Sequence, residues 1–154
     1  THGLTHIRDL TLSLDGRALT GADTLGAMTG PDRKRLDRVM QRQAMHGIDF
    51  DLRFHLHPDV DATLDLGGTA VSMVLKSGEI WIFRHDGVAE LRLEPSVYLE
   101  AGRLKPRASR QIVLSASVFD QACQLVWTLA KAQDTPAAIR DTDGEDPLLI
   151  VQGK

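Results

Sequence analysis

The sequence lacks several features that would assign it to a particular class of protein. It has one cysteine, Cys123, so no disulfide can form within the chain. The cysteine count therefore does not decide between an oxidising and a reducing compartment. No apolar run approaches the roughly 20 residues of a membrane-spanning helix, and no basic-then-apolar signal segment opens the chain. A formal net charge of −3 and a pI near 6.0 give no general attraction to nucleic acid or to an anionic membrane. We therefore expect no nucleic-acid partner and no membrane partner.

The length and composition fit one globular domain. The chain has 154 residues, of which 42% are hydrophobic and 25% charged, and this is enough to bury an ordinary core. It opens directly into a strand pattern with Thr1 rather than methionine, which suggests a fragment of a longer protein. We expect a β-sandwich domain over residues 1–135 and a polar C-terminal tail over residues 136–154.

The middle of the chain, residues 61–94, alternates apolar and polar residues between glycine-marked turns. The turns are Gly67-Gly68, Ser77-Gly78 and Asp86-Gly87. Steps of about ten residues between turns are typical of the strands of a sandwich or barrel, so this stretch is predicted to be a β-meander. Its third run, residues 80–83, is apolar on both faces, and we expect this strand in the middle of its sheet.

Period-two alternation predicts further strands outside the meander. They cover residues 6–14, 17–25, 48–56, 96–99, 111–118 and 122–129. Asp15-Gly16 closes the first two into a hairpin, and the last two are predicted to pair with each other. Apolar residues at helical spacing predict one helix inserted at about residues 30–46. The fold class is therefore all-β: a meander-rich, two-sheet antiparallel β-sandwich with one short inserted α-helix.

The most specific candidate for a metal site is the pair His55 and His57, at the end of one predicted strand. Residues two apart on a strand share a face about 6.5–7 Å apart, so both imidazoles could bind one metal, with Asp59 or Asp61 as a third ligand. Alternatively, both histidines lie beside Arg53 on the solvent-facing or domain-facing side of the strand. A His-x-His pair without a third ligand at a fixed spacing is a weak signal. We assign no metal and treat Arg53, His55 and His57 as candidate contacts to a substrate or to another domain.

Aromatic and basic side chains are the remaining candidates. An aromatic platform is typical of carbohydrate-binding modules, but Trp81 and Trp127 stand among apolar strand residues, where core packing is expected. Tyr98 fits either environment. The basic cluster in residues 103–110 could meet an acidic glycan, although such clusters are more often solvated. A free-standing carbohydrate-binding module and a cupin-like metal enzyme that uses the histidine pair stay open as alternatives.

Several short segments carry a family resemblance that extends to about residue 141. They are Gly3–Arg8, Leu10–Ser13, Gly21–Leu25, Phe54–Pro58, Ser96–Tyr98, Gln111–Leu114 and Trp127–Leu129. In their order and spacing they resemble the C-terminal part of bacterial heparinase II/III-like proteins, which are polysaccharide lyases. The resemblance implies a longer parent in which an N-terminal (α/α) toroid partners a C-terminal antiparallel β-sandwich. It also implies that the parent cleaves uronic-acid-containing polysaccharides, such as glycosaminoglycans, by β-elimination in the periplasm.

The resemblance supplies no catalytic residue for this chain. In proteins of that family, the active-site residues and any metal come from the toroid and from the first part of the sandwich. The resemblance places these parts ahead of the strand that begins here at His6. The sequence has no asparagine and one tyrosine, Tyr98, so the family's Asn-Tyr-His constellation cannot be assembled on it. We expect no cofactor. The expected role is to brace the toroid and to form one wall of the cleft for an acidic polysaccharide, without catalysis by the fragment alone.

We predict that the chain purified without chelator carries no stoichiometric zinc. A stable zinc site needs three or four converging ligands, and nothing at a fixed spacing completes the histidine pair. Elemental analysis of the purified protein tests this. An equimolar amount of metal that is lost in a His57→Ala variant would overturn the prediction.

Overall fold

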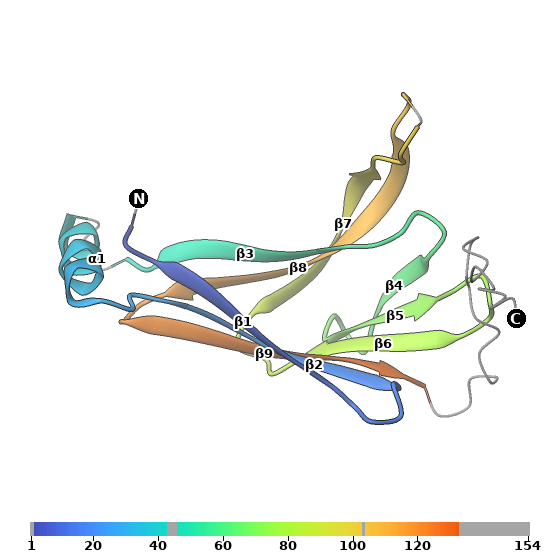
Figure 1. Ribbon diagram of the computed structural model, residues 1–154, viewed down its shortest axis with the longest axis horizontal. Helices are drawn as coiled ribbons and strands as arrows, with labels where there is room; N and C mark the ends of the chain where they lie inside the picture. Colours follow the sequence, from blue (N-terminus) through green and yellow to red (C-terminus); the bar gives the residue numbers. More distant parts are fainter. Residues whose placement is uncertain (1, 43–45, 103, 133–154) are drawn as a thin grey trace, which may run out of the picture.

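The computed structural model describes residues 2–42, 46–102 and 104–132, and it shows two antiparallel sheets around a shared core with one helix at one end (Figure 1). The elements are β1 (Thr5–Leu12), β2 (Ala18–Gly26), α1 (Gly30–Arg42), β3 (Ile48–His55), β4 (Asp61–Asp65), β5 (Ala70–Val74), β6 (Ile80–His85), β7 (Glu90–Tyr98), β8 (Arg107–Val118) and β9 (Ala122–Lys131). The larger sheet has the order β1-β2-β9-β6-β5-β4, and the smaller has the order β3-β8-β7. The predicted sandwich with an inserted helix is confirmed. The predicted tail, residues 136–154, lies outside the described residues.

Helix α1 is capped at its N-terminus and anchored by its apolar side. The Thr29 side-chain oxygen accepts a backbone N–H from the first turn, which is an N-cap interaction. Leu36 and Met40 are buried in a small cluster separate from the main core. The helix ends at Arg42 within the described residues. The predicted helix extends to about residue 46, and residues 43–45 lie outside the described part. No helix in the described part is long and apolar enough to cross a membrane.

Two predictions about strand pairing are wrong. Strands β4, β5 and β6 form the predicted meander, but after Asp86-Gly87 the chain crosses to the smaller sheet, where β7 pairs with β8. The predicted pairing of β8 with β9 is also wrong, because these strands lie in opposite sheets. Alternation specifies which face of a strand is buried and leaves its neighbours undetermined. The periodicity of the sequence therefore could not decide either pairing.

A third prediction is wrong because of Pro95. The two short strands expected on either side of this proline are one strand, β7, in which Pro95 is paired with Arg110. Strand β7 is an edge of the smaller sheet. An edge strand has hydrogen-bonding neighbours on one side only, so a proline is tolerated where the missing N–H would point away from the sheet.

Aromatic rings from both sheets form the centre of the core. The ring of Phe54 on β3 lies 5.1 Å from that of Phe83 on β6 and 5.0 Å from that of Trp127 on β9, between centroids. The rings of Phe83 and Trp127 stack at 5.7 Å. Strand β6 lies inside the larger sheet between β5 and β9, as its two apolar faces predicted. The predicted core positions of Phe54 and Trp127 are confirmed.

A buried carboxylate ties this cluster to the first hairpin. Asp23 on β2 is 2% exposed, and it accepts hydrogen bonds from Trp127 Nε1 at 2.7 Å and from Arg8 Nε at 2.7 Å. His6 Nε2 lies 2.5 Å from the same carboxylate. Burial raises the pKa of Asp23, but the hydrogen bonds from Arg8, Trp127 and His6 outweigh it and hold the pKa below its usual value. The carboxylate is therefore ionised and fully partnered at neutral pH.

We predict that Phe83→Ala lowers the free energy of unfolding by about 3–5 kcal/mol, and that Phe54→Ala, whose ring is half-buried, lowers it by about 3 kcal/mol. Both rings contact Trp127, so each truncation removes packing between the sheets. The matched control is Phe119→Ala, because that side chain is 68% exposed and should cost less than about 1 kcal/mol. Urea unfolding measures all three. A loss below about 1 kcal/mol for Phe54→Ala would mean that this ring does not belong to the core.

Candidate functional site

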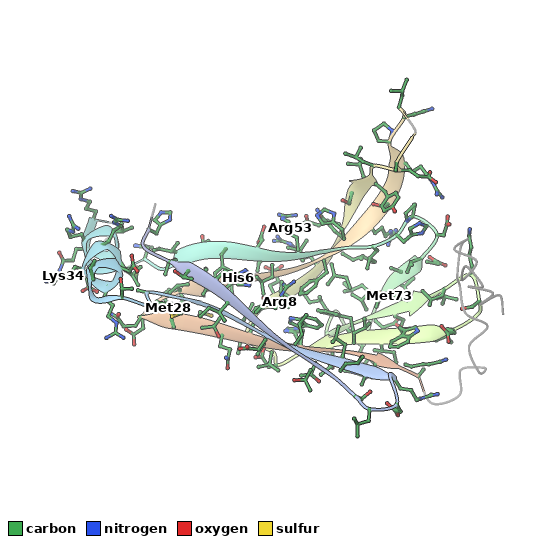
Figure 2. The ribbon with its side chains drawn as sticks, in the orientation of Figure 1. His6, Arg8, Met28, Lys34, Arg53 and Met73 are labelled. Carbon is green, nitrogen blue, oxygen red and sulfur yellow. The ribbon has the colours of Figure 1, made fainter. Side chains whose placement is uncertain are left out.

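The candidate site is the face of the smaller sheet that points away from the larger sheet. Because Phe54 points into the core, its neighbours Arg53 and His55 on β3 point outward. Figure 2 shows Arg53 on the side of β3 away from the larger sheet. Strand β7 brings Glu94 and Ser96 to the same face. We call this surface the outer polar face; it comprises Asp51, Arg53, His55, Glu90, Arg92, Glu94, Ser96, Gln111 and Ser115.

Arg53 forms ion pairs with two carboxylates. Its guanidinium donates to Asp51 at 2.5 Å and to Glu94 at 2.9 Å. Hydrogen bonds to Glu94 and Asp51 raise the pKa of Arg53 above its usual value. Arg92 Nε also lies 3.2 Å from Glu94, so two arginines share this carboxylate. These side chains cover Val113, which is fully buried although it lies on the outward face. Binding an anion at Arg53 would require breaking pairs that already shield the sheet.

His55, unlike Arg53, contacts a single polar side chain in the described part of the structure. Its Nδ1 lies 3.0 Å from the hydroxyl oxygen of Ser96, and the side chain is exposed. Within the described residues the imidazole has no other hydrogen-bond partner, so Nε2 faces solvent. A histidine held by one nitrogen presents the other in a fixed direction, where it can donate to or accept from a ligand.

His57 lies beyond the end of β3 in a different environment. Its Nδ1 accepts the backbone N–H of Asp59 at 3.2 Å, and its ring lies edge-on to Tyr98 with centroids 5.0 Å apart. The Asp59 carboxylate contacts Lys76 at 2.7 Å and Arg107 at 2.5 Å. Hydrogen bonds from Lys76 and Arg107 lower the pKa of Asp59 to about 2. This ion-pair cluster ties the loop after β3 to the β7–β8 hairpin.

The structure brings together only part of the predicted set. Arg53 and His55 share the outer polar face, whereas His57 belongs to the cluster around Asp59. In residues 2–42, 46–102 and 104–132, no three His, Cys, Asp or Glu side chains are placed to hold a metal. The cupin-like alternative therefore has no third ligand within that part, and both histidines lie outside the core. The predicted absence of a bound metal stays a prediction.

The tryptophans do not form a carbohydrate platform. Trp127 is buried, and Trp81 packs against the same core cluster. The core packing expected for both is confirmed, and this weighs against the free-standing carbohydrate-binding module.

Sequence reasoning missed the contacts made by Tyr98, Asp59 and Arg107. Asp59 and Arg107 are 48 residues apart in the chain, and Tyr98 reaches His57 from another strand. No local spacing signals such contacts, because they depend on how the β7–β8 hairpin folds over the loop after β3. The basic cluster expected in residues 103–110 is thus partly paired, through Arg107.

This chain is similar to known proteins in sequence and in fold. The family described as "Heparinase II/III-like, C-terminal" matches residues 1–128. FtsZ-localized protein C of Caulobacter vibrioides is 32% identical over 132 residues, which are 85% of this chain and 21% of that protein. The fold also matches the crystal structure of heparan sulfate lyase HepC from Pedobacter heparinus, with a TM-score of 0.62 and 12% identity. The match takes in 94% of this chain and 21% of the HepC chain. The predicted resemblance is confirmed, and this chain spans about a fifth of the length of both relatives.

We predict that Asp59→Asn destabilises the chain at neutral pH and that its effect fades in acid. A carboxylate whose pKa is lowered on folding contributes stability above its unfolded pKa of about 3.9, and this contribution is lost as the pH falls towards about 2. The measurement is urea unfolding of both proteins at about pH 6, 3 and 2. Asp9→Asn, an exposed carboxylate on β1, is the control and should show a small effect throughout. A deficit for Asp59→Asn that is equal at all three pH values would contradict the prediction.

Proposed function

We propose, because the chain belongs to the heparinase II/III-like C-terminal family, that it is the C-terminal β-sandwich of a longer polysaccharide lyase. The observation that carries this is the structural match to heparan sulfate lyase HepC, which takes in nearly all of this chain and about a fifth of that enzyme. In the parent, β-elimination would act on a uronic-acid-containing glycan. The role of this chain would be to brace the N-terminal toroid and to form one wall of the cleft.

Uncovered apolar surface on β1 supports the bracing role. Register with β2 places Leu10 and Leu12 on the same side of β1 as Arg8, the side that faces the core. These leucines are nevertheless 56% and 64% exposed, because six strands of the larger sheet face only three of the smaller. Burying such surface is favourable by roughly 25 cal/mol per Å². A further part of the parent packed against β1 would bury it.

The arrangement of polar groups supports a wall rather than a catalytic centre. Removing a proton next to a carboxylate requires a positioned base and preorganised donors for the developing negative charge. On the outer polar face, the cations Arg53 and Arg92 are paired with carboxylates. His55 remains as a group that can contact a glycan hydroxyl or carboxylate. An acidic polysaccharide would therefore be bound through the parent, with catalysis supplied from outside this chain.

We expect no lyase activity from the purified chain and activity from the longer protein that contains it. The substrates to test are heparin, heparan sulfate and alginate, and the product is the unsaturated uronate, read by its ultraviolet absorbance. A His55→Ala variant of the longer protein should raise KM more than it lowers kcat if His55 lines the cleft. A steady rise in absorbance with the chain alone, abolished by substituting His55, His57 or Tyr98, would sink the proposal.

A second candidate function comes from the sequence relative. The identity to FtsZ-localized protein C extends over most of this chain, so the parent could belong with that protein rather than with the lyases. Fluorescent fusion of the longer protein tests this candidate by asking whether its signal coincides with FtsZ in dividing cells. Coincidence without any release of unsaturated uronate would favour the second function over the first.

A further inference from the structure

Helix α1 concentrates positive charge in a chain that is acidic overall. Between Gly30 and Arg42 lie five basic and two acidic residues, which give the helix a formal charge of +3 against −3 for the whole chain. The basic residues are Arg33, Lys34, Arg35, Arg38 and Arg42, and all are exposed. Figure 1 places the helix at the end of the molecule away from β4, β5 and β6.

These cations differ from most others in the fold because carboxylates do not neutralise them. Arg53, for comparison, is held between Asp51 and Glu94. Within the part of the chain that the structure describes, no basic side chain of α1 forms an ion pair with a carboxylate. Arg38 Nε donates a hydrogen bond to the backbone oxygen of Lys34 at 3.1 Å, which leaves the positive charge without a carboxylate partner in the described part. The charge of the helix is therefore available to a ligand.

The cations are also arranged in a line. Lys34, Arg38 and Arg42 are four residues apart, so they share one side of the helix at steps of about 6 Å over about 12 Å. Figure 2 shows Lys34 on the side of α1 away from the sheets. On the opposite side, Leu36 and Met40 are buried, which fixes the rotation of the helix. Like charges at this spacing destabilise a helix, and an anionic ligand would relieve their repulsion.

We propose that Lys34, Arg38 and Arg42, which we call the α1 cation stripe, bind a linear acidic polysaccharide laid along the helix. The binding site lies on this chain itself and is separate from the outer polar face. It goes beyond the proposed function and does not require the parent to be a lyase.

The geometry favours a polysaccharide over an anionic bilayer and over single-stranded nucleic acid. A helix that binds a bilayer surface inserts its apolar side among the lipids. The apolar side of α1, formed by Leu36 and Met40, is already buried in the protein interior. Single-stranded nucleic acid is held by aromatic residues that stack on its bases, and the stripe contains none. A flexible chain that carries sulfate or carboxylate groups at intervals needs only the line of cations.

The test uses the 154-residue chain and fluorescently labelled heparin at low salt. The variant Lys34→Gln, Arg38→Gln, Arg42→Gln removes the stripe while keeping a good helix-forming residue at each position. The matched control, Arg17→Gln, Arg84→Gln, Lys105→Gln, removes the same charge from exposed cations elsewhere. A third variant, Arg38→Lys with Arg42→Lys, keeps the charge of the stripe. Circular dichroism compares the fold of all four proteins.

We expect the stripe variant to bind heparin about 10-fold or more weakly, and the other two variants to stay within about 2-fold of the original chain. Binding of the original chain should also weaken as salt rises. Equal loss in the matched control would overturn the proposal, because net charge alone would then explain it. Equal loss in the Lys variant would also overturn it, as would undiminished binding by a correctly folded stripe variant. Tighter binding to phosphatidylglycerol vesicles or to single-stranded DNA at the same salt would replace the polysaccharide with that ligand.

Discussion

The hydrogen bond from the indole of Trp127 to the buried carboxylate of Asp23 is the interaction on which the rest of the fold depends. An ionised carboxylate in a core is costly unless hydrogen bonds satisfy it, and leaving it without partners would cost several kcal/mol. Asp23 gains its partners from both sides, from Trp127 on β9 and from Arg8 on β1. Three strands of the larger sheet are thus fixed to one another at a single point.

This arrangement also requires a glycine beneath the indole. A Cβ at Gly21 would lie 2.2 Å from the Trp127 ring, so only glycine lets the indole lie against β2 while its N–H reaches Asp23. From there the contacts reach the other sheet, because the guanidinium of Arg8 sits 5.1 Å from the centre of the Phe54 ring on β3. Polar satisfaction and aromatic packing therefore act together at the junction of the two sheets.

Charge is arranged differently on the outer polar face and on helix α1. On the outer polar face, Arg53 and Arg92 are shared among carboxylates and shield Val113, which leaves that face with little unpaired charge. On helix α1, the cations are exposed and have no such partners within the described residues. In the proposed roles, the neutralised outer polar face would position the sandwich and the α1 cation stripe would attract an acidic polysaccharide. Fold alone does not establish either role, so each is tied to particular side chains.

The sequence by itself determined the class of fold, the first hairpin, the inserted helix and the inward face of several strands. These follow from local patterns: alternation in β3 put Phe54 in the core and Arg53 outside, and Asp15-Gly16 closed the turn between β1 and β2. Family membership could also be read from segment order. The tertiary structure decided which strands are neighbours, so β7 joined β8 and β9 joined β6. It also decided the partners of His57 and Asp59, because contacts such as that between Asp59 and Arg107 join residues far apart in the chain and leave no mark on local periodicity.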